Sequence, residues 1–264
     1  MESNAQFWIM DKLCSALDRE TAKIVTFNVQ KQARRLGKAV LAATTHTDLL
    51  EDLAPSVHVH KGWGERICIK YYPNGLNKFC RVTRNLRIEE GTIEDYKCLA
   101  EFHYRNPETR PIPIKIFTLK KADGECVGVI LYSCPPPNIF GRKKAVGRRV
   151  SIEELNRDWT TISRVIVHPK YRSVGLGSRL VRETLPLVGR KYIETMAVMA
   201  LYNPFFEKAG MIRIAERRPP ERVKETLRVL EDLGFKRYLL MSVQYNFERL
   251  KDLNVRRCAG LRMH

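Results

Sequence analysis

Short apolar runs and one amphipathic stretch alternate along the first 78 residues. The apolar run Phe7–Met10 has the length and character of a buried parallel strand. A helical pattern follows, with Asp18 placed as its N-cap and Gly37 as its C-terminal stop. Residues 38–43 and the apolar patch at 57–59 predict two more strands. This order of strand, helix and strand predicts a parallel sheet with right-handed crossovers.

The pattern in residues 79–264 is longer and mixed. Apolar segments on both sides of a turn at 122–125 predict an antiparallel hairpin, and the β-branched segment 159–167 predicts a central strand. Strands are predicted at 81–89, 114–120, 126–132, 159–167, 192–198 and 211–215, and helices at 93–104, 175–188, 203–208 and 219–233. Residues 238–253 suggest a last strand and helix whose places are not fixed. The predicted fold class is α/β, a mixed sheet flanked by helices.

Length and hydropathy set the broad class of protein. The chain has 264 residues, roughly two domains, and 44% of them are hydrophobic, which is enough to form a core. We predict a domain at 1–78 and a second at 79–264, with an inserted basic loop at 134–158. No apolar run reaches the ~20 residues that cross a bilayer, so a soluble, cytoplasmic protein with no membrane partner is expected.

Charge is concentrated in the second domain. The chain has 47 Lys and Arg against 29 Asp and Glu, and residues 79–264 alone have a net charge of +15. Such a field attracts polyanions, among them RNA and acidic proteins. The inserted loop is the predicted docking surface for such an acceptor, through Arg142, Lys143, Lys144, Arg148 and Arg149. The seven cysteines form no Cys-x-x-Cys pair, so neither a disulfide framework nor a metal site is predicted.

Three motifs in the first domain resemble successive elements of ABC-type ATPases. The sequence FWIMD at 7–11 resembles the Walker B strand, SALD at 15–18 the D-loop, and TTHTD at 44–48 the switch-histidine loop. The resemblance implies that Asp11 would hold Mg²⁺ through water, that Asp18 belongs to the D-loop, and that His46 would contact the γ-phosphate.

The chain departs from that family in two ways. Lys12 stands where the family has the glutamate that polarises water, and no Gly-x-x-x-x-Gly-Lys-Ser/Thr loop occurs in the chain. We therefore interpret residues 1–78 as the C-terminal part of such an ATPase, with exposed apolar surface where the rest of its sheet would pack. ATP and Mg²⁺ would bind only with the missing part supplied, so a partner chain or a second copy is expected.

A basic turn with two glycines joins the strand 159–167 to the next helix. Residues 167–178 read VHPKYRSVGLGS. Free N–H groups at a helix start, together with the helix dipole, bind anions, and glycine lets the backbone approach a phosphate closely. The junction is therefore a candidate phosphate site.

The same turn resembles the acetyl-CoA pyrophosphate loop of the GNAT superfamily of acyltransferases. The matching pattern is Arg172-x-x-Gly175-x-Gly177, and NPFFEKAGM at 203–211 is similar to the following helix and strand of that family. The resemblance covers residues 81–218 and implies acetyl-CoA as cofactor. It implies that the cofactor is bound by Val165, Ile166, Val167, Arg172, Ser173, Val174, Gly175, Leu176, Gly177, Ser178 and Asn203.

The resemblance implies direct acetyl transfer to an amine, with a general base and an acid near the thioester. Phe206 stands where many members of the family have the tyrosine acid. Tyr202, four residues earlier and therefore on roughly the same helical face, is the candidate substitute. Glu194 is the first candidate for the base, ahead of Asp158 and Glu154.

The two resemblances together are similar to a prokaryotic family of ABC-type ATPases fused to an acetyltransferase domain. The predicted function is an acetyl-CoA-dependent N-acetyltransferase whose acceptor is RNA, tRNA, a protein or a small amine. The alternative is a degenerate fusion without catalytic activity that binds nucleic acid or a partner chain through its basic surface.

Overall fold

The structure is a computed structural model that describes residues 6–72, 79–103, 112–198, 200, 202–216 and 220–260, with side chains up to residue 253. The chain forms two compact units, Met1–Ile214 and Ala215–His264. The first unit holds all the strands of the described residues and every candidate site residue. The second contains α8 (Glu221–Asp232), a 3₁₀ turn at Arg237–Leu239 and α9 (Val243–Gly260).

The predicted strand, helix and strand at the start of the chain are confirmed. Strands β1 (Phe7–Met10) and β2 (Ala39–Ala42) pair in parallel, and α1 (Arg19–Leu36) connects them. The carboxylate of Asp18 accepts hydrogen bonds from the N–H groups of the first turn of α1, and Gly37 ends the helix with φ 63°. Both ends of α1 are therefore specified locally by residues that the sequence identifies, the side chain of Asp18 and the left-handed backbone of Gly37.

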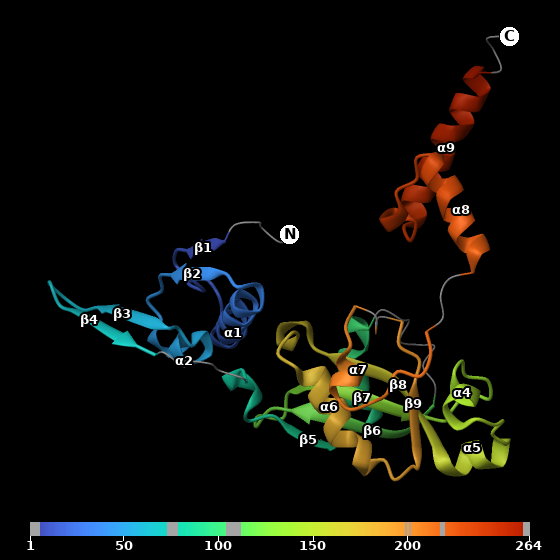
Figure 1. Cartoon of the computed structure of the whole chain (residues 1–264), viewed down its shortest axis with the longest axis horizontal. Coiled ribbons are helices and arrows are strands. Elements are labelled where there is room, and N and C mark those ends of the chain that lie inside the picture. Colours follow the sequence, from blue (N-terminus) through green and yellow to red (C-terminus); the bar gives the residue numbers. More distant parts are fainter. Residues whose placement is uncertain are drawn as a thin grey trace. The chain divides into compact units, whose positions relative to one another are not determined.

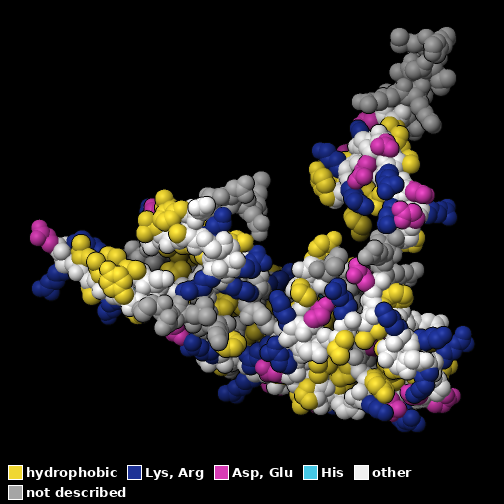
Figure 2. Space-filling model, viewed as in Figure 1, with side chains coloured by type: hydrophobic (Ala, Val, Ile, Leu, Met, Phe, Trp, Pro, Cys, Tyr) yellow, Lys and Arg dark blue, Asp and Glu magenta, His cyan; other side chains and the backbone are white. Residues whose placement is uncertain are grey.

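The third predicted strand forms, but it does not extend the parallel sheet. After a 3₁₀ turn at Thr47–Leu49 and α2 (Leu50–Leu53), β3 (Val57–Lys61) pairs antiparallel with β4 (Ile67–Tyr71) in a separate hairpin. Hydrophobic side chains gather over this hairpin (Figure 2) and remain exposed, among them Val59 and Ile69, which are register partners. The apolar patch at 57–59 thus joins none of the apolar clusters that the described residues form.

The main sheet has five strands in the order β5-β6-β7-β8-β9 (Figure 1). Its strands are β5 (Arg87–Glu90), β6 (Pro113–Lys120), β7 (Cys126–Ser133), β8 (Trp159–Val167) and β9 (Tyr192–Thr195). Its helices are α3 (Ile93–Leu99), α4 (Arg142–Val146), α5 (Ile152–Asp158), α6 (Leu176–Thr184) and α7 (Phe205–Lys208). Short 3₁₀ turns occupy Arg81–Thr83, Ala100–Phe102, Pro169–Tyr171 and Leu185–Leu187. The neighbouring strands from β5 through β8 pair antiparallel, and β8 pairs with β9 in parallel, which confirms a mixed sheet flanked by helices.

Several predicted boundaries are wrong in ways that follow from local chemistry. The segment 81–89 contains a turn before its strand, because the Thr83 hydroxyl and backbone N–H both bond to the carbonyl of Cys80. Residues 211–215 form no strand in the structure. The inserted loop 134–158 contains two short helices, of which α5 is capped by Ser151.

Two apolar clusters cover the two faces of the sheet. Tyr96 and Leu99 of α3 pack against one face, and Leu180 and Val181 of α6 pack against the other. The second cluster also contains Ile24 and Phe27 of α1. Both of these α1 side chains are only 4% exposed, so the core crosses the predicted domain boundary between residues 78 and 79.

None of the helices in the described residues is long and apolar enough to cross a membrane.

The shared core predicts that a substitution in α1 destabilises the five-stranded domain. Replacing Phe27 with alanine should lower the free energy of unfolding by about 3–5 kcal/mol, because it removes a buried aromatic ring and leaves a cavity. Urea unfolding followed by tryptophan fluorescence measures this loss. Phe7→Ala is the matched control, since Phe7 is 51% exposed, and should cost much less. Equal losses from both substitutions would contradict the shared core.

Candidate functional site

Strand β8 loses its partner on one side halfway along its length. Residues Trp159 to Ile162 pair with β9, whereas β7 stays paired with β8 as far as Val167. A bulge accompanies the change, because Leu131 and Tyr132 of β7 face Arg164 and Ile162, which leaves Ser163 as the extra residue. The last residues of β8 therefore have one hydrogen-bonding edge that no described strand uses.

The register shows which residues offer that edge. The N–H of His168 donates to the carbonyl of Val127 on β7. In an antiparallel pair the bonded residues alternate, so Ile166 also directs its N–H and C=O to β7, and Val165 and Val167 direct theirs the other way. Of the three predicted cofactor residues on this strand, two offer backbone groups to a ligand and Ile166 does not.

The loop after β8 turns sharply into α6. Ser173 has φ 70°, and Gly175, the residue before the helix, has φ 90°. None of the six backbone N–H groups from Ser173 to Ser178 donates a hydrogen bond to another described residue. Unpaired N–H groups at the start of a helix form an anion site, which the helix dipole strengthens.

The loop is held in place from two sides. The Arg172 guanidinium donates to the carbonyls of Val167, at 3.0 Å, and Phe102, at 3.1 Å. Its side chain therefore braces the turn rather than reaching for a ligand. Helix α1 holds the loop from another side, where Lys31 Nζ donates to the carbonyl of Ser173 at 2.8 Å.

A group of ion pairs fixes the start of α1 against the turn before the loop. Lys170 Nζ lies 2.9 Å from Asp18 and 3.1 Å from Glu20, and the Tyr171 hydroxyl donates to Glu20 at 2.7 Å. Hydrogen bonds from Thr21 and then Lys170 hold the pKa of the Asp18 carboxyl well below its usual range. Burial raises the pKa of Glu20, but the hydrogen bonds from Tyr171 and from lysines outweigh it and leave that pKa lowered.

Helix α7 approaches the loop with its first residue. A Cβ added at Gly177 would lie 3.5 Å from the Phe205 ring, so the chain that carries Asn203 enters beside the loop. The helix begins at Phe205, so Tyr202 is not on it. Tyr202 is 79% exposed and Phe206 is 8% exposed. The prediction that the two aromatic residues share a helical face is therefore wrong, and the acid role of Tyr202 stays a prediction.

Glu194 and Arg142 form a buried ion pair. Arg142 Nη2 lies 2.5 Å from Glu194 Oε1, and Arg142 Nε lies 3.1 Å from Oε2. The guanidinium also donates to the carbonyls of Pro136 and Pro137 and lies over the Trp159 ring. Arg142 is 7% exposed. Arg142 therefore anchors the insertion and is not part of an exposed docking surface, which corrects that prediction.

The ion pair also bears on the predicted general base. Both carboxylate oxygens of Glu194 accept from Arg142, and the Thr161 hydroxyl donates to one of them at 3.2 Å. A carboxylate engaged in this way must give up one of these hydrogen bonds before it can take a proton from a substrate, and the base role of Glu194 stays a prediction. The alternatives are engaged as well, because Glu154 pairs with Arg148 and Asp158 pairs with Arg157.

The other basic residues of the insertion lie on its surface. Lys143, Lys144, Arg148 and Arg149 are exposed. Arg148 is engaged with Glu154 in a bidentate ion pair. Docking of an acidic acceptor by these residues stays a prediction.

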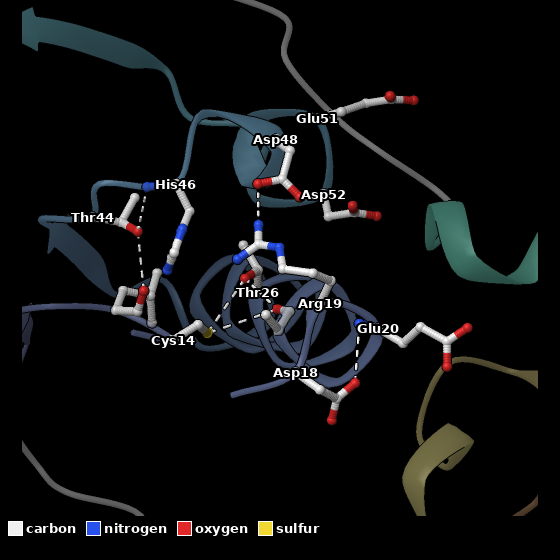
Figure 3. Close-up of polar contacts among 12 residues, drawn as sticks. Cys14, Asp18, Arg19, Glu20, Thr26, Thr44, His46, Asp48, Glu51 and Asp52 are labelled. Atoms are coloured by element: carbon white, nitrogen blue, oxygen red, sulfur yellow. Dashed lines mark hydrogen bonds and ion pairs between the residues drawn. The ribbon is translucent and has the colours of Figure 1, made fainter. Parts of the chain in front are cut away.

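The ATPase-like residues at the start of the chain have structural contacts (Figure 3). Asp18 caps α1, and Asp48 pairs with Arg19. Thr44 bridges the N–H of His46 and the carbonyl of Leu13. The Asp11 carboxylate accepts from the N–H of Lys12. No group of three or more possible metal ligands occurs among the described residues, and nothing in these contacts supports ATP or Mg²⁺ binding.

The geometry defines a class of protein. After Ile162, β8 has no described partner on the β9 side, and this gap in the sheet is the opening of the site. The loop at the end of β8 adds N–H groups that have no described acceptor. Together they suit an extended ligand with a phosphate group at one end. Residues 82–211 match the model of the acetyltransferase (GNAT) family. This part of the chain, just under half of its length, is thus a GNAT acetyltransferase domain, the domain of an N-acetyltransferase. The match does not extend to the ATPase-like segment.

Solved structures similar to this chain are acetyltransferases. A 6′-N-acetyltransferase for aminoglycoside antibiotics from Acinetobacter baumannii is 10% identical, covers 51% of this chain and 96% of its own, and has a TM-score of 0.37. A GNAT-family acetyltransferase from Streptococcus pneumoniae is 16% identical, covering 51% and 99%, with a TM-score of 0.33. An aminoglycoside N-acetyltransferase in complex with CoA is 12% identical, covering 51% and 97%, with a TM-score of 0.36. The comparison with curated proteins found no match.

The buried ion pair predicts a stability effect that separates anchoring from catalysis. Glu194→Gln should lower the free energy of unfolding by about 3–5 kcal/mol, because it leaves the Arg142 guanidinium buried without its counter-charge. Arg142→Met should cost a similar amount. Thermal and urea unfolding measure both losses. A Glu194→Gln variant that is as stable as the parent would contradict the anchoring role.

Proposed function

We propose that this chain transfers an acetyl group from acetyl-CoA directly to an amine. The observation that supports this most is the loop between β8 and α6, where six consecutive N–H groups have no described acceptor. A pyrophosphate group supplies acceptor oxygens for such a row of donors. Together with the family match of residues 82–211, this makes acetyl-CoA the ligand that the loop suits best.

The free edge of β8 would orient the rest of the ligand. Val165 offers its N–H and C=O and Val167 offers its N–H, in the pattern of a strand that lacks its neighbour, whereas the Val167 carbonyl already accepts from Arg172. The pantetheine arm contains amides that could pair with this edge. The thioester would then lie near Ile162 and Thr195, where β9 leaves β8. Holding both reactants there converts a bimolecular step into an effectively unimolecular one.

The reaction needs few groups from the protein. The lone pair of the amine attacks the thioester carbonyl carbon, a C–N bond forms, the C–S bond breaks, and the amine nitrogen loses a proton. Glu194, Glu154 and Asp158 are held in ion pairs, so we assign proton acceptance to water. The leaving thiolate takes its proton from Tyr202 or from water.

The acceptor would be an amine on an acidic macromolecule, RNA or protein. Supporting this are the exposed side chains of Lys143, Lys144 and Arg149 on the insertion, which Arg142 fastens to β9 through Glu194. Positive charge at that position would attract a polyanion and hold it beside the end of the sheet where the thioester is expected.

Release of CoA thiol tests the proposed function. The full chain with acetyl-CoA should release thiol when a suitable amine is added from a panel of small polyamines, RNA and acidic proteins. Gly175→Ala should lower the apparent affinity for acetyl-CoA about tenfold or more, since a side chain at φ 90° strains the loop and crowds the phosphate.

Gly124→Ala is the matched control for that variant. Gly124 also has φ 90°, also has no atom within 4 Å of an added Cβ, and lies in the hairpin turn between β6 and β7. It should lose similar stability but keep its affinity for acetyl-CoA. A folded chain that neither binds acetyl-CoA nor releases thiol would refute the proposed function.

A further inference from the structure

A lysine from outside the acetyltransferase domain contacts the candidate phosphate loop. Lys31 lies on α1, well before residues 82–211, and its Nζ is 2.8 Å from the carbonyl oxygen of Ser173. Its position is fixed by neighbours on the same helix, because Ile24 and Phe27 are buried in the core of the domain. The contact therefore belongs to the packing of α1.

The position of the contact matters for the direction of the loop's N–H groups. The carbonyl of Ser173 and the N–H of Val174 belong to one planar trans peptide unit and point in opposite directions. Because the Lys31 ammonium group binds this carbonyl, the Val174 N–H of the same peptide unit points away from Lys31. The hydrogen bond to the carbonyl also polarises that N–H. Ser173 itself has φ 70°, an uncommon conformation for a residue with a side chain, so this peptide unit needs an external partner to stay in place.

The two charges that affect Lys31 most, those of Lys208 and Arg35, are both positive. Burial, and then the nearby charges of Lys208 and Arg35, lower the pKa of Lys31. Lys31 forms no ion pair with any carboxylate of the described residues. Like charges gathered beside an anion loop repel one another until negative charge arrives, and a bound phosphate would relieve this repulsion.

We propose that Lys31 is a positioning residue for the phosphate end of acetyl-CoA, acting through the carbonyl of Ser173. This rests on the proposed function. The inference extends it by making cofactor affinity depend on α1, a helix outside the matched family domain. The N-terminal segment then serves the acetyltransferase site directly, whatever its own origin.

Calorimetric titration of acetyl-CoA into variants of the full chain tests this role. Lys31→Met should weaken binding about tenfold, the size expected for a lost charged hydrogen bond, and Lys31→Arg should restore most of the affinity. Lys23→Met is the control, because Lys23 lies about two turns earlier on the same helix, and among the described residues it forms no hydrogen bond or ion pair with the loop, unlike Lys31. In the free protein, the amide ¹⁵N resonance of Val174 should shift in Lys31→Met and not in Lys23→Met.

The outcomes are distinguishable from failure of the proposed function. Unchanged acetyl-CoA affinity in Lys31→Met would overturn the role of Lys31 while leaving acetyl transfer intact. Equal weakening by Met and Arg would also overturn it, since charge would then not matter. Failure of the parent chain to bind acetyl-CoA would overturn the proposed function and this inference together.

Discussion

Everything the candidate site can do depends on where β9 stops pairing with β8. The pairing ends at Ile162 and Thr195, while β7 continues to Val167. Backbone groups that leave a ladder must find other partners or face water. The Val167 carbonyl finds Arg172, and the N–H groups of Val165 and Val167 with the Val165 carbonyl remain as an edge that an amide-containing ligand can pair with. The loop that follows β8 has N–H groups from Ser173 to Ser178 with no described acceptor. Edge and loop thus form one extended site.

The parts of the chain around the unpaired end of β8 are held by side-chain contacts rather than by the sheet. Arg142 joins the insertion to β9 through a buried ion pair with Glu194, and Ile24 and Phe27 of α1 are buried in the core of the domain. The exposed Lys31 of α1 donates to the loop. Removing one partner of a buried ion pair is costly because the other charge stays desolvated. The insertion and α1 therefore behave as parts of the acetyltransferase unit, although the family match covers neither α1 nor the strand pair it connects.

Features set by neighbouring residues could be predicted from the sequence. The caps of α1 at Asp18 and Gly37, the hairpin β6–β7, strand β8 and the glycine loop all form as expected. Contacts between distant residues could not be predicted. Arg142 and Glu194 are 52 positions apart and Lys31 and Ser173 are 142 apart, and no local pattern indicates which charge a basic residue will meet. The patch at 57–59 shows the same limit, since its strand was predicted and its partner was not.

Hydrogen exchange at the β8 edge tests the site most directly. NMR-detected exchange of the full chain, measured with and without acetyl-CoA, should show new protection at the amides of Val165 and Val167 and from Ser173 to Ser178. The amide of Ile166 should change little, because it already bonds to β7. Protection confined to other parts of the chain, or none at saturating acetyl-CoA, would contradict an acetyl-CoA site in this opening.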